Sequence, residues 1–97
     1  MALIVEKFGG TSVGDVDRIN AVADQIAHTK TSGVQLVVVL SAMAGETNRL
    51  LDLGTQVSPA SEHREIDVLI STGEQVTIAL LALALEARGV RARSYTG

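Results

Sequence analysis

Three short segments contain residues whose types and spacing could do chemistry, and the first is rich in glycine. It reads KFGGTSVG and runs from Lys7 to Gly14. Glycines let a backbone approach an anion closely, and the amides that open a following helix can bind phosphate oxygens. Lys7 stands two residues before the Gly9–Gly10 pair, so its ammonium group could meet a phosphate as a point charge. A tight turn with a solvated lysine is equally compatible with this spacing.

The glycine-rich segment matches neither of the two best-known phosphate loops. Gly9 and Gly14 have the spacing of the P-loop, GxxxxGK[S/T], but Asp15 and Val16 occupy the positions of its Lys and Ser/Thr. The dinucleotide fingerprint GxGxxG starts at neither Gly9 nor Gly10. Phosphate binding here would therefore need a different arrangement.

The second segment, SAMAGETN at residues 41–48, follows the apolar run LVVVL at residues 36–40. Ligands of open α/β sheets bind beyond the carboxyl ends of the strands. The hydroxyl groups of Ser41 and Thr47 could therefore face the same ligand as Lys7. The alternative, which spacing alone favours, is that Ser41 is a turn residue and Thr47 a helix N-cap.

The third segment, STGE at residues 71–74, interrupts a long apolar stretch. The helical pattern places Glu74 between Ile70 and Ile78, on a face that it predicts to be buried. A buried carboxylate must be paired or must meet the cation of a ligand. The alternative is that Glu74 belongs to the first turn of a helix, where the helix dipole favours an acidic residue.

The composition restricts the class of protein. The 97 residues include one proline and no cysteine, and 46% are hydrophobic, as in a small globular domain. A net charge of −3 and two aromatic residues argue against a nucleic-acid partner. The two histidines and the lack of thiols argue against a metal centre.

The N-terminus has no basic region of a signal peptide. The uncharged stretch at residues 75–85 is too short to cross a bilayer. We therefore expect a cytoplasmic protein with no membrane partner.

The elements that must position these residues alternate between strand and helix. Residues 2–8 and 36–40 read as strands, and the second is apolar at every position, as in a parallel sheet covered on both faces. A helix of about 15 residues is predicted between them, starting at Gly14 or Asp15 and ending before Gly33. Together they predict a right-handed βαβ unit.

The remaining elements are mostly helical. We expect a short helix at residues 47–56, a linker at 57–61 and two helices within 62–88. The two helices would meet at Ser71–Glu74, and the second, apolar all round, would be buried and closed by Gly89. Residues 91–95 form a weaker candidate for a third strand. Such a sheet keeps an open edge, which suggests a piece of a longer polypeptide.

Taken together, KFGGTSV at 7–13, VVVLSAMAGETN at 37–48 and STGEQVT at 71–77 resemble the aspartate kinases, of the amino acid kinase family. The similarity covers the whole chain, and the combination is specific although each motif alone is not. It implies an α/β fold, a three-layer αβα sandwich with a mainly parallel sheet. Residues 1–97 would be the N-terminal portion of the catalytic domain, without its remainder and without the ACT regulatory domains.

The resemblance also implies an activity. An aspartate kinase uses MgATP to phosphorylate the side-chain carboxylate of L-aspartate, giving 4-phospho-L-aspartate for lysine, methionine and threonine biosynthesis. Thr47 and Glu74 would hold the aspartate, Glu74 by pairing with its α-ammonium group. Lys7 would also be catalytic. The residues implied for the ATP phosphate site are Lys7, Phe8, Gly9, Gly10 and, beside them, Ser41.

Two other functions stay open at this point. The chain could belong to another amino acid or carboxylate kinase with the same loops. It could also be a non-catalytic interaction module that keeps the fold, with its open sheet edge and apolar last helix as a dimerisation surface. In either kinase case we expect the 97 residues alone to be inactive, and to form a homo-oligomer or to associate with the rest of the enzyme.

Overall fold

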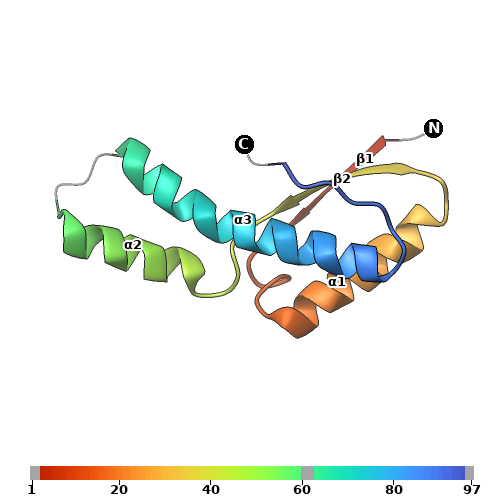
Figure 1. The fold of residues 1–97 in the computed structure, drawn as a ribbon, viewed down its shortest axis with the longest axis horizontal. Coiled ribbons are helices and arrows are strands. Elements are labelled where there is room, and N and C mark those ends of the chain that lie inside the picture. The colour runs from red at the N-terminus through yellow and green to blue at the C-terminus, as the bar shows by residue number, and fades with distance from the viewer. Residues whose placement is uncertain (1–2, 60–62, 96–97) are drawn as a thin grey trace.

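The computed structural model describes residues 3–59 and 63–95. A βαβ unit comes first, a helix then extends away from it, and a longer helix returns over the βαβ unit (Figure 1). The elements in chain order are β1 (Leu3–Phe8), α1 (Val16–Lys30), β2 (Gln35–Leu40), α2 (Glu46–Val57) and α3 (His63–Ala87). The predicted strands, the first helix and the short helix are thus confirmed within these bounds.

The sheet of the described residues consists of β1 and β2, paired parallel and in register. Leu3 lies opposite Gln35 and Phe8 lies opposite Leu40. The hydrogen bonding continues past the strands, because the Ser41 amide donates to the Phe8 carbonyl at 3.2 Å. Both strands therefore end at the same level, and the segments that follow them leave from one edge of the sheet.

The α1 helix forms where its apolar stripe and its end signals predict it. The Asp15 carboxylate accepts a hydrogen bond from the Arg18 amide at 2.8 Å and caps the first turn. Gly33, at a φ of 80°, takes the left-handed conformation beyond its other end. The buried residues of α1 are Ile19, Val22, Ala23 and Ile26.

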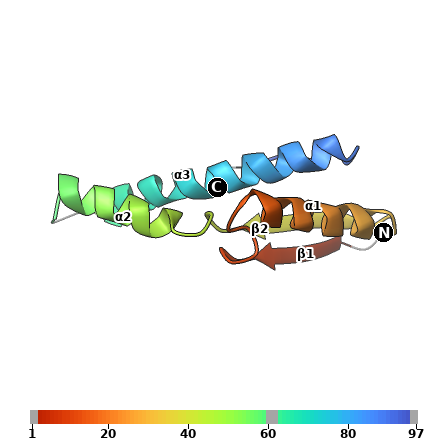
Figure 2. The ribbon, with the colours of Figure 1, turned by 90° about the horizontal axis from the view of Figure 1, so that it is seen from below.

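The α3 helix lies over both halves of the molecule, with α2 against one end and α1 against the other (Figure 2). Leu81 and Leu85 of α3 join the buried side chains of α1 and Leu40 of β2 in the main hydrophobic core. Burial of these side chains is the main favourable contribution to the fold, since apolar area removed from water stabilises by about 25 cal/mol per Å².

Only one face of the sheet is covered in the described residues. Leu36, Val38 and Leu40 alternate with Val37 and Val39, and the first three are packed against the core. Val37 and Val39 are 47% and 46% exposed. The α/β class and the parallel sheet are confirmed, while the second helix layer expected from the apolar β2 is not formed by this part of the chain.

The α3 segment differs from its sequence prediction, since it is one continuous helix. The Ser71 and Thr72 hydroxyl groups each donate to a carbonyl one turn earlier, at 2.7 Å. These bonds satisfy the two hydroxyl groups inside the helix. The packing of α3 against α1, α2 and β2 keeps it continuous through this polar segment. The helix is also not buried all round, because Val76 and Leu83 are 51% and 61% exposed.

Gly89 ends α3 as predicted. Its φ is 74°, and the Val90 amide donates back to the Leu85 carbonyl at 3.0 Å, as in a Schellman motif. Residues 91–95 are not a strand, because they pair with neither β1 nor β2. Of the predicted linker, Val57 belongs to α2, and residues 60 and 61 lie outside the described residues, as does residue 2 of the first strand.

Arg88 connects the end of α3 to α1. Its Nε donates to the Asp24 carboxylate at 2.7 Å, and a second guanidinium nitrogen lies 3.3 Å from the Asn20 side-chain oxygen. A third donates to the Ala84 carbonyl at 2.8 Å. Since Arg88 is three-quarters buried and bonded on several sides, it fixes the angle between the two helices.

The α3 helix is long and apolar enough to cross a membrane by length and composition alone. An 18-residue window within its residues Arg64–Ala87 has a mean hydropathy of 1.8. The uncharged stretch at residues 75–85 is shorter because it is bounded by Glu74 and Glu86. A membrane-spanning segment of this length can contain a few charged residues. In the structure α3 packs against α1, α2 and β2, and this packing explains why its inner face is apolar.

Candidate active site

The two segments that follow the strands are in contact, and the contacts join glycines of the first segment to alanines of the second. A Cβ at Gly10 would lie 3.4 Å from the Ala42 carbonyl oxygen. One at Gly14 would lie 3.2 Å from the Ala44 Cβ. The small residues therefore allow the first segment to lie directly on the second.

The third segment reaches the same place from α3. A Cβ at Gly73 would lie 3.1 Å from the Ala42 Cβ and 3.2 Å from Leu50 Cδ1, which is tighter than most such contacts. Glycine thus lets α3 pack its backbone against the start of α2 and the loop before it. Ala42, which is 4% exposed, is the point at which all three segments meet.

Lys7 and Phe8 leave the end of β1 on opposite faces. Phe8 is half-buried and packs against the main core. Lys7 is exposed, and it lies in register with Val39 on the uncovered face of the sheet. The lysine side chain is therefore accessible. The Phe8 ring instead holds the end of the strand in place, and the Phe8 backbone carbonyl accepts the hydrogen bond from the Ser41 amide.

The glycine pair forms a turn with open space above it. The Ser12 amide donates to the Gly9 carbonyl at 3.0 Å, and nothing lies within 4 Å of where a Gly9 Cβ would be. Neither Gly9 nor Gly10 has a positive φ, so the absence of a side chain matters here for access and not for conformation. Ser41, half-buried, starts the neighbouring segment.

Thr47 is not the N-cap of α2, so that alternative is wrong. Gly45, at a φ of 79°, precedes the helix and provides no side-chain cap. Thr47 lies in the first turn with its side chain exposed. Its neighbour Glu46 accepts hydrogen bonds from Arg49 at 2.6 and 3.2 Å, and these lower the pKa of the Glu46 carboxyl.

Glu74 lies in the middle of α3, so the first-turn alternative is also wrong. The expected burial is wrong as well, because Glu74 is exposed. The buried face is taken by Gly73 and by Thr77, whose fully buried hydroxyl donates to the Gly73 carbonyl at 3.2 Å. Glu74 is therefore placed one residue from the contact with Ala42, and its side chain is exposed to solvent.

The residue types in these three adjoining segments suit an anion and an amino group. Backbone amides, the Lys7 ammonium group and the Ser41 hydroxyl are donors of the kind that bind phosphate oxygens. Glu74 adds a carboxylate at the third segment. Within residues 3–59 and 63–95, no cluster of three or more His, Asp and Glu side chains could hold a metal ion.

Comparison with known proteins tests the resemblance to the amino acid kinase family. The amino acid kinase family model matches residues 2–97. The chain belongs to the amino acid kinase family. The resemblance that the three motifs suggested is thereby confirmed.

Individual members of the family are similar over the full chain. It is 63% identical over 97 residues to "Aspartate kinase Ask_LysC" of Stutzerimonas stutzeri and 60% identical to the aspartokinase of Pseudomonas aeruginosa. These alignments include 100% of this chain and 24% of each relative, so the chain spans about a quarter of the length of the curated relatives.

Two solved structures also superpose on this chain. The aspartate kinase from Synechocystis has a TM-score of 0.86 at 60% identity, over 90% of this chain and 15% of that one. The E. coli aspartokinase III in complex with aspartate and ADP has a TM-score of 0.73 at 26% identity, over 98% and 31%. The parallel βαβ unit with its helical pair is thus the fold of this part of aspartate kinases.

Sequence reasoning missed Ala42, Gly73 and Thr77 as site-forming residues.

The contact of Gly73 with Ala42 predicts that a branched side chain at 73 separates α3 from the loop. We expect Gly73→Val to lower the free energy of unfolding by about 1–3 kcal/mol through overpacking. Ala79→Val, at an exposed position of the same helix, should cost less than about 1 kcal/mol. Urea unfolding measures both, and equal losses would contradict the close contact.

Proposed function

We propose that the chain provides the phosphate-binding and aspartate-binding segments of an aspartate kinase. The reaction is the MgATP-dependent phosphorylation of the L-aspartate side-chain carboxylate to 4-phospho-L-aspartate. The observation that carries the proposal is the meeting of the three motif segments at Ala42. Relatives over 60% identical named aspartate kinase, and a similar structure titled as a complex with aspartate and ADP, support the choice of substrates.

The ATP phosphates would bind where β1 and β2 end. Lys7, with the amides around Gly9 and Gly10, would present positive potential to the phosphate oxygens, with Ser41 beside them. Phe8 would contribute through its backbone position. Such fixed groups stabilise charge that develops on the transferred phosphoryl group, which is the main task of the protein in this chemistry.

The aspartate would bind between the start of α2 and the middle of α3. The Thr47 hydroxyl is a hydrogen-bond donor or acceptor for the substrate, and the Glu74 carboxylate would pair with its α-ammonium group. The exposed positions of both side chains support this role, since each faces solvent in the described part of the chain. The attacking carboxylate is ionised at neutral pH, so this chain needs no general base.

Mg²⁺ enters this proposal as part of the substrate MgATP. The loop groups named above are mostly donors, which suit phosphate oxygens and not a divalent cation. No residue of this chain is therefore assigned to the metal.

We further propose that residues 1–97 are the N-terminal portion of the catalytic domain in a cytoplasmic enzyme. The chain covers 24% of the relatives' length, and the apolar residues Val5, Val37 and Val39 on the bare sheet face fit a further layer of the same domain. That layer and the adenine-binding groups would come from the remainder. A homo-oligomer is the assembly that we propose for the complete protein.

A chimera tests this function directly. The chain replaces the aligned 97-residue segment of the Pseudomonas aeruginosa aspartokinase, and acyl phosphate is trapped with hydroxylamine. We expect turnover with aspartate on the order of 1–100 per second. A folded chimera without turnover would support the non-catalytic module, and turnover with another carboxylate in place of aspartate would support a different kinase of the family.

Lys7→Ala in this chimera should lower turnover by about 100- to 1,000-fold, because its ammonium group meets charge that grows in the transition state. The KM for aspartate should change little. Arg18→Ala, which removes an exposed cation from α1, is the control and should leave both constants unchanged. Near-normal turnover of the lysine variant would make Lys7 a solvated turn residue.

Glu74→Gln should raise the apparent KM for aspartate at least about tenfold, since it removes one partner of a charge pair with the substrate. The KM for ATP should stay nearly constant. Glu65→Gln removes another exposed carboxylate from the same helix, away from Gly73, and serves as the control. If the two variants have the same steady-state constants, Glu74 is only a surface residue of α3.

A further inference from the structure

A hollow lies against the covered face of β2, away from the glycine-rich segment. Its volume is about 170 Å³, and residues of β2, α1, α3 and the segment 90–94 surround it. Leu36 and Val38 form one wall, and Leu81 and Leu85 form another. An apolar cavity of about 150 Å³ is large enough to hold benzene. This cavity therefore has room for an apolar group of about six carbon atoms.

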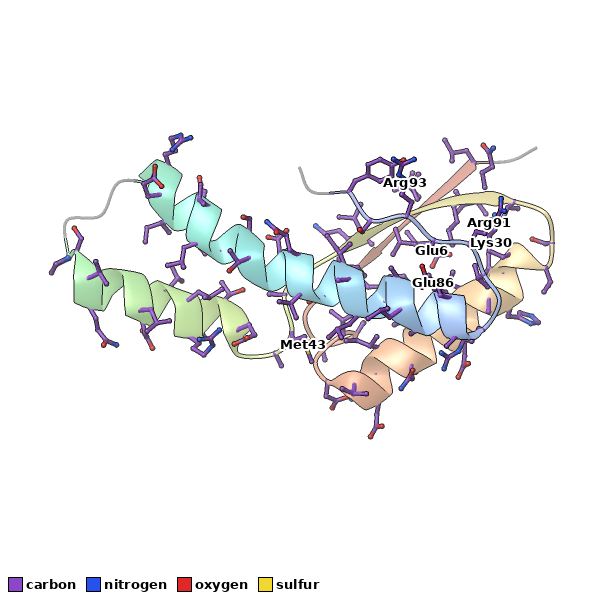
Figure 3. All side chains as sticks on the ribbon, in the orientation of Figure 1. Glu6, Lys30, Met43, Glu86, Arg91 and Arg93 are labelled. Atoms are coloured by element: carbon purple, nitrogen blue, oxygen red, sulfur yellow. The ribbon has the colours of Figure 1, made fainter. Side chains whose placement is uncertain are left out.

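The charged groups that line this cavity are all cationic. They are Lys30, at the end of α1, and Arg91 and Arg93 from the segment after α3. Ser94 adds a hydroxyl group. Figure 3 shows Lys30 and Arg91 beside each other, with Arg93 further along the same segment. Three of the eight Lys and Arg residues of the chain thus line one hollow.

These cations keep hydrogen-bond donors that the described part of the chain does not use. The ion pairs found there are Arg49–Glu46, Arg64–Glu65 and Arg88–Asp24, and none involves the three cavity residues. The Lys30 ammonium group donates to the Val34 carbonyl at 2.8 Å and has two further protons. Arg93 lies over the Tyr95 ring, 5.7 Å from its centre.

Two carboxylates lie in the same region but do not line the cavity. Figure 3 shows Glu6 and Glu86 near this end of the molecule. Glu86 lines the neighbouring hollow, together with Arg91 and Arg93. It attracts the two arginines from outside the cavity and competes with any anion bound within it.

We propose that this cavity binds a small organic carboxylate with an apolar body of about six carbon atoms. The apolar part fills the space between β2 and α3, and the carboxylate meets Lys30 and Arg91 at the mouth. A planar guanidinium group matches a carboxylate well, because it donates two parallel hydrogen bonds. The cavity shares no residue with Lys7, Thr47 or Glu74, so this proposal does not depend on the proposed kinase function.

A pair of matched probes tests the proposal on the 97-residue chain. Cyclohexanecarboxylate and cyclohexylmethanol have the same ring but differ in charge, and NMR titration measures the affinity of each. We expect saturable shifts at Leu36, Val38 and Leu85, and binding of the carboxylate at least about fivefold tighter than that of the alcohol. Equal affinities, or no saturable binding of either probe, would overturn the proposal.

Variants separate the two parts of the site. Lys30→Gln and Arg91→Gln should bring the affinity for the carboxylate down to that for the alcohol, which stays unchanged. Ala82→Leu fills the cavity from α3 and should weaken both probes by about fivefold or more. Arg64→Gln, an exposed cation outside the cavity, is the control and should alter neither affinity. Carboxylate binding that survives the charge variants, or that survives Ala82→Leu, would also overturn the proposal.

Discussion

The parallel pairing of β1 with β2 is the constraint on which the rest of the structure depends. Because Phe8 lies opposite Leu40, both strands end at one level, and the Ser41 amide extends the pairing into the loop. A shift of β1 by one residue would turn every side chain of that strand to the other face. It would expose Phe8, bury Lys7 and separate the two segments whose small residues now touch.

The sequence was informative where one physical signal dominated. The apolar stripe from Ile19 to Ile26, with a capping aspartate before it and Gly33 after it, predicted α1 closely. It failed in α3, because the packing of this helix against α1, α2 and β2 outweighs the low helix propensity of Ser71 and Thr72. Tertiary contacts of this kind leave no local mark on the sequence.

The candidate site shows a similar division. The motif residues were recognised from their types and order, but their environments were not. Glu74 was expected to be buried because its neighbours are apolar, whereas Gly73 and Thr77 occupy the inner face and turn it to solvent. The residues that bring the segments together, above all Ala42, have no reactive group, so motif reasoning could not select them.

The bond between Arg88 and Asp24 has a consequence for the order of folding. It joins residues 64 positions apart, whereas the paired residues of β1 and β2, such as Leu3 and Gln35, are half as far apart in the sequence. Closing a longer loop costs more chain entropy, and contacts that are distant in sequence tend to form late. We therefore expect the second half of α3 to dock onto a βαβ unit that has already formed. Since Arg88 lies at the end of that half, its release would be an early step of local unfolding, and it would uncover the core side chains of α1 before the strands separate.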